Sequence, residues 1–76
     1  MNSRGVKNEA VYDELRRIEA EVVQGERQLA EHEALLVTLQ RQKEDTSKVR
    51  EELEMMRTQQ RAREQQRQQL LSLLHP

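Results

Sequence analysis

The side chains of this chain that could do chemistry are two histidines, many carboxylates and a run of arginines. A protein zinc site needs several His, Cys or carboxylate ligands that converge on one point. His32 has no such partner, because Gln28 and Leu36 stand one helical turn away on either side, and His75 lies at the far end. The chain contains no cysteine. We therefore expect neither a metal site nor a cofactor.

Catalytic residues are equally hard to find in the sequence. No serine stands beside a plausible base, and the only glycines are Gly5 and Gly25, so there is no glycine-rich phosphate loop. The many carboxylates recur three or four residues apart, a spacing typical of solvated helix faces and of ion pairs along them. We expect a protein that is not an enzyme and has no small-molecule substrate.

The arginine-rich segment 57–69 could contact phosphates. It holds four arginines and one glutamate, a local charge of 4 − 1 = +3, and such a segment binds nucleic acid with a salt-dependent affinity. A regulatory nucleic-acid or chromatin cofactor is therefore the alternative function. The segment has no aromatic residue to stack on bases, and the whole chain carries a net charge of −1. These two facts disfavour nucleic acid as the partner and favour an acidic helix.

The composition excludes a compact globular core. The 76 residues include no Trp, Phe or Cys and one Tyr, and 36% are charged. Such a chain, rich in Glu, Arg, Gln and Leu, is typical of a long helix or coiled coil. No segment approaches the roughly 20 apolar residues of a membrane span, and the start of the chain lacks the apolar stretch of a signal peptide. We expect a cytoplasmic or nuclear protein without a membrane span.

Apolar residues recur in a heptad pattern that predicts one narrow seam along a helix. With Leu15 at position a, the pattern runs to Leu39, slips by three residues and resumes to Leu74. A seam this narrow suits a second helix lying alongside. The predicted helix-pairing interface comprises Val11, Leu15, Ile18, Val22, Leu29, His32, Leu36, Leu39, Val49, Leu53, Met56, Leu70 and Leu74.

The charges beside the seam predict antiparallel pairing. Residues 1–38 hold five cations and eight anions, a net −3, and residues 39–76 hold eight and six, a net +2. Parallel self-pairing would set glutamate against glutamate, whereas antiparallel pairing sets opposite charges together and places Gly25 opposite Gln60. The charges expected to determine this specificity are Glu19, Glu26, Glu33, Lys43, Arg50, Arg57, Arg63 and Arg67.

We therefore predict an all-α, elongated coiled coil with antiparallel helices. It is either a helical hairpin that turns near residues 41–46 or a long single helix that pairs between chains. The chain divides into a flexible lead-in (1–7), an acidic-flanked helix (8–42) and a basic, Gln-rich helix with a terminal leucine cluster (43–76). The expected function is that of an oligomerisation, adaptor or scaffold subunit, whose partner is a second copy or a different helical protein.

Overall fold

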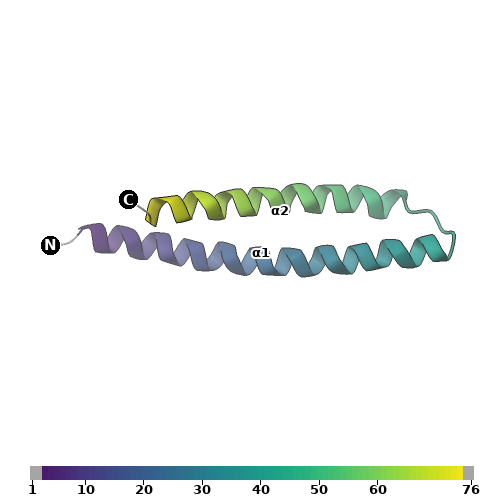
Figure 1. Ribbon diagram of the computed structural model, residues 1–76, viewed down its shortest axis with the longest axis horizontal. Helices are drawn as coiled ribbons and strands as arrows, with labels where there is room; N and C mark the ends of the chain where they lie inside the picture. The colour runs from purple at the N-terminus through teal and green to yellow at the C-terminus, as the bar shows by residue number, and fades with distance from the viewer. Residues whose placement is uncertain (1–2, 75–76) are drawn as a thin grey trace.

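The protein folds as a hairpin of two long helices (Figure 1). The computed structural model describes residues 3–74, with side chains from residue 8 onward. Helix α1 spans Ser3–Arg41 and helix α2 spans Ser47–Leu74. The hairpin measures 65 × 15 × 14 Å along its principal axes. The prediction of an all-α, antiparallel and elongated fold is confirmed, and of its two forms the chain adopts the hairpin.

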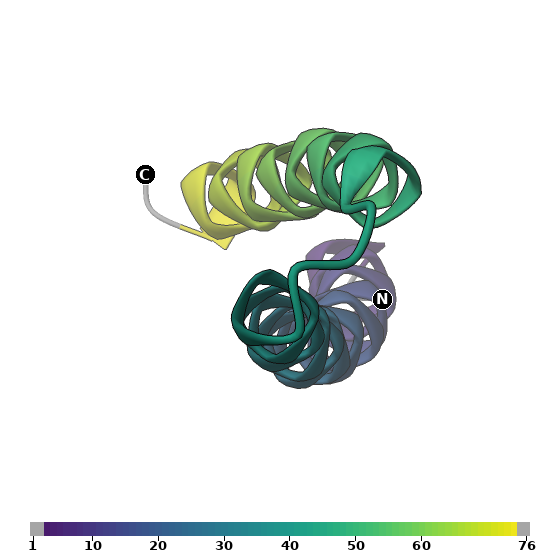
Figure 2. The same cartoon turned by 90° about the vertical axis from the view of Figure 1, so that its right-hand side faces the viewer.

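The core of the hairpin is thin. Its buried apolar side chains are Leu15, Ile18, Val49 and Leu53, which are between 1% and 8% exposed. Viewed from the turn, each helix faces the other along one side and leaves the rest of its circumference open (Figure 2). Since a heptad seam covers only a narrow stripe of a helix, this is the geometry that the apolar pattern requires.

Helix boundaries differ from the predicted ones at two places. Helix α1 begins at Ser3, so residues 3–7 are helical and do not form the expected lead-in; Met1 and Asn2 lie outside the described residues, as do His75 and Pro76. A formed helix extends at little cost once it has nucleated, so α1 continues beyond the predicted start at residue 8 to Ser3. Helix α2 begins at Ser47 and not at the predicted residue 43, because residues 42–46 form the turn.

The turn ends α1 with a Schellman-type cap that contains no glycine. The amide of Lys43 donates to the carbonyl of Gln40 (3.1 Å), and the amide of Glu44 donates to the carbonyl of Leu39 (2.9 Å). This pair of hydrogen bonds requires a left-handed backbone conformation at the residue that donates the first of them. Lys43 occupies that position with φ 58°. The turn therefore forms although neither Gly nor Pro marks it in the sequence.

Asp45 organises the start of α2. Its Oδ1 accepts hydrogen bonds from the Ser47 amide (3.0 Å) and the Ser47 hydroxyl (2.6 Å). The hydroxyl bond first, and the amide bond second, hold the pKa of the Asp45 carboxyl below its usual value. The carbonyl of Thr46 accepts the first helical bond, from the Arg50 amide at 2.9 Å. The side chain of Asp45 thus satisfies one of the free amides of the first turn of α2.

The left-handed backbone of Lys43 generates a prediction. We expect Lys43→Gly to raise the free energy of unfolding by about 1 kcal/mol, because a residue with a Cβ is strained in this conformation and glycine is not. Thermal unfolding followed by circular dichroism measures the change. The matched control is Lys48→Gly in the first turns of α2, which should lower stability by up to about 1 kcal/mol. Destabilisation by both variants would contradict the assigned cap.

Candidate interaction surface

The residues of the predicted helix-pairing interface lie along the contact between α1 and α2. Leu15, Ile18, Val49 and Leu53 are buried there. The remaining members are half-buried: Val11, Val22, Leu29, His32, Leu36, Leu39, Met56, Leu70 and Leu74. Most of the seam thus stays partly open to solvent, and the helices gain only a modest hydrophobic stabilisation from it.

A polar layer interrupts the seam halfway along. The Nε2 of Gln60 donates to the backbone carbonyl of Val22 (2.8 Å), and its Oε1 accepts from the Nη1 of Arg63 (3.1 Å). With 6% exposure, Gln60 is the most buried polar side chain of the hairpin in the described residues. Both ends of its amide are therefore paired, as burial of such a group demands.

Gly25 makes room for this layer. A helical side chain leans over the turn that precedes it, so a residue larger than glycine at 25 would cover the Val22 carbonyl. A Cβ built on Gly25 would overlap the Oε1 of Gln60 and stand 2.9 Å from the Nη1 of Arg63. The structure thus places Gln60 against Gly25, as in the antiparallel alignment derived from the sequence.

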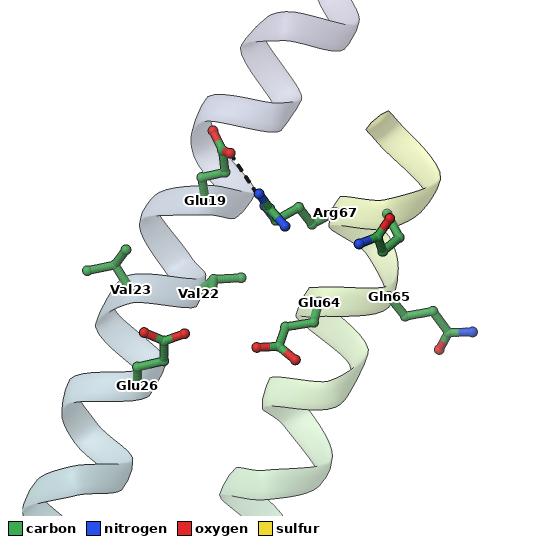
Figure 3. Close-up of a pocket in the computed structure, with 8 residues that line it drawn as sticks. Glu19, Val22, Val23, Glu26, Glu64, Gln65 and Arg67 are labelled. Atoms are coloured by element: carbon green, nitrogen blue, oxygen red, sulfur yellow. Dashed lines mark hydrogen bonds and ion pairs between the residues drawn. The ribbon is translucent and has the colours of Figure 1, made fainter. Parts of the chain in front are cut away.

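Salt bridges join the two helices beside the seam. The Nε of Arg67 lies 3.4 Å from the Oε2 of Glu19 (Figure 3), and the Nη2 of Arg57 lies 3.5 Å from the Oε2 of Glu33. These side chains are 38% to 57% exposed, so each pair contributes at most about 1 kcal/mol. Their main effect is to favour the antiparallel direction.

His32 forms a further cross-helix contact. Its Nε2 lies 3.2 Å from the Oε1 of Glu52, and both side chains are partly exposed. The contact is a hydrogen bond when the imidazole is neutral and an ion pair when it is protonated. His32 therefore joins the helices as a seam residue, with one polar partner on α2.

The other four charges predicted to determine specificity form no salt bridge between the helices in the described residues. Arg63 bonds to Gln60 on its own helix, and the Nε of Arg50 donates to the Oγ1 of Thr46 (3.0 Å). Lys43 lies in the turn. Glu26 lines a shallow groove between the helices. Of the eight predicted charges, four meet across the hairpin: Glu19, Glu33, Arg57 and Arg67.

The shallow groove lies beside the polar layer. In Figure 3, Glu64 extends from α2 towards the side of α1 that carries Val22 and Glu26. The hollow is open to solvent. Its lining residues are Glu19, Val22, Val23, Glu26, Glu64, Gln65, Arg67 and Gln68.

Large apolar residues outside the seam form a feature that the heptad analysis missed. Each is between 42% and 66% exposed: Tyr12, Val23, Leu35, Val37, Met55 and Leu73. Their only signal in the sequence is their position, since they occupy heptad positions other than a and d. Among residues 8–74, six large apolar side chains are thus exposed and four apolar side chains are buried.

Among the described residues, no group of three or more His, Asp or Glu side chains is arranged to hold a metal ion. Within the same part of the chain, neither helix is long and apolar enough to cross a membrane.

The polar layer generates a second prediction, in the form of a double-mutant cycle. We expect Gly25→Ala to destabilise the hairpin by about 1–2 kcal/mol, because the new methyl displaces Gln60 and leaves a buried amide without its partners. In a Gln60→Ala background the same change should stabilise by about 1 kcal/mol, because alanine is the better helix former. Thermal unfolding of the four proteins measures the coupling. Equal effects of Gly25→Ala in the two backgrounds would contradict the contact.

Comparisons with known proteins add no relationship: no family model, no curated protein and no solved structure matches this chain.

Proposed function

We propose that the protein is a non-enzymatic helical hairpin that acts through protein–protein association, as an oligomerisation, adaptor or scaffold subunit of a larger assembly. One observation carries the proposal. The hairpin buries four apolar side chains and leaves six large ones between 42% and 66% exposed. Large apolar side chains that the fold leaves exposed offer contact surface to a partner protein.

The small core of the hairpin supports the same proposal. A small chain buries a low fraction of its surface, and the core here is a single narrow stripe interrupted by Gln60. A partner that binds only the folded form stabilises it by mass action. Association would thus complete the fold as well as connect the protein to an assembly. The partner is a second copy or a different helical protein, in the cytoplasm or the nucleus.

The alternative nucleic-acid function receives no support from the arginine-rich segment. Arg57 and Arg67 pair with glutamates of α1, and Arg63 bonds to Gln60. Arg61 donates to the hydroxyl of Thr58 (3.3 Å). The four arginines thus make contacts within the hairpin, and glutamates of α1 offset the charge of two of them, which does not favour a basic face that follows a phosphate backbone.

Site-specific photo-crosslinking in cells tests the proposal. A photoreactive amino acid replaces Val23 on α1 or Met55 on α2, and a third variant carries it at Glu51, a polar exposed position. We expect a discrete adduct of defined mass from at least one of the two apolar positions and none from Glu51. No adduct at any position, or the same diffuse products from all three, would contradict association as the function.

A further inference from the structure

Helix α1 carries a second heptad row that the hairpin does not use. Its members follow one another at alternating intervals of three and four residues: Ala20, Val23, Arg27, Ala30, Ala34 and Val37. All six are exposed, with Val23 at 56% and Val37 at 44%. Ala20, Val23 and Arg27 also border a hollow on the surface of α1. We call this row the outer seam.

We propose that the outer seam binds a second copy of this chain in the antiparallel direction, so that two hairpins join through their α1 helices. This inference rests on the proposed function and names the partner. It commits to self-association because the side chains of the outer seam are complementary in size, and because its one charged residue, Arg27, would meet a glutamate beside the seam of the second copy.

Size complementarity follows from the order of residues along the outer seam. In an antiparallel pair with a central two-fold axis, Ala20 faces Val37 of the second copy and Val23 faces Ala34 of the second copy. Arg27 faces Ala30 of the second copy in the same register. Each layer therefore sets one alanine against one larger side chain, which lets the helices approach closely without leaving voids. A parallel pair would instead stack valine on valine and Arg27 on Arg27.

Charge complementarity selects the same arrangement. Arg27 lies in the middle of the outer seam and has no ion pair within the described part of the chain. In the antiparallel register its stem would lie on Ala30 of the second copy, and its guanidinium would reach Glu31 beside that alanine. The two-fold axis repeats this contact, so the dimer gains two such pairs.

The first test compares the dimer affinity of three proteins by sedimentation equilibrium: the wild type, Ala30→Arg and Ala62→Arg. Ala30→Arg sets two cations against each other in the central layer, while on its own helix the new arginine stands one turn from Glu26 and Glu33 and preserves helicity. Ala62 is an exposed alanine of α2, outside the outer seam, and serves as the matched control.

We expect a wild-type dimer, at least ten-fold weaker dimerisation of Ala30→Arg, and no change for Ala62→Arg. A dimer that Ala30→Arg leaves intact, such as one formed by exchange of α2 between chains, would overturn the inference. A monomeric wild type whose Val23 crosslinks to a different protein would overturn self-pairing and leave the proposed function standing. Absence of any crosslink would overturn both.

The second test measures the direction and register of the α1–α1 pair by disulfide formation. No native cysteine competes, because the chain contains none. Val23→Cys and Ala34→Cys chains are oxidised separately and as a mixture. We expect a disulfide between the two variants in the mixture, and no efficient linkage of either variant to itself. Efficient Val23→Cys homodimers would indicate parallel pairing and overturn the inference, as would random linkage in the mixture.

Discussion

The hydrogen bond from Gln60 to the Val22 carbonyl, made over Gly25, is the interaction on which the register of this hairpin depends. Apolar contacts along a heptad seam tolerate a shift by one heptad, but a shifted Gln60 would lose its acceptor. A buried amide without a partner costs about 1–3 kcal/mol. The pairs of Glu19 with Arg67 and of Glu33 with Arg57 form in the same register, so they depend on this layer for their geometry.

The proposed association surface follows from how few apolar residues the hairpin buries. One stripe of each helix faces the other, and Leu53 on this stripe is almost fully buried, while Val23 remains 56% exposed on the outer seam of α1. A helix with two heptad rows can bind two neighbours at once, one within the chain and one outside it. Folding and the proposed association therefore draw on different faces of the same helix.

The sequence predicted the seam and the opposition of Gly25 and Gln60, because burial of apolar residues follows the heptad period and a small residue accommodates a large one. It predicted a turn near residues 41–46 as one of two forms but did not decide between the turn and a continuous helix, since the left-handed conformation of Lys43 is imposed by hydrogen bonds that close the end of α1 and no residue type there requires it. The outer seam was also missed, because alanine and arginine give it little apolar contrast with the solvated faces.

The distance between two spin labels within one chain tests the hairpin most directly. Labels on Arg17→Cys and Gln65→Cys lie on exposed faces of α1 and α2, and labelled chains are diluted into an excess of unlabelled ones. The hairpin predicts a separation on the order of 20 Å, set by helix packing and helix diameter, that persists on dilution. A separation of about 70 Å, the length of an uninterrupted helix between these positions, would contradict it.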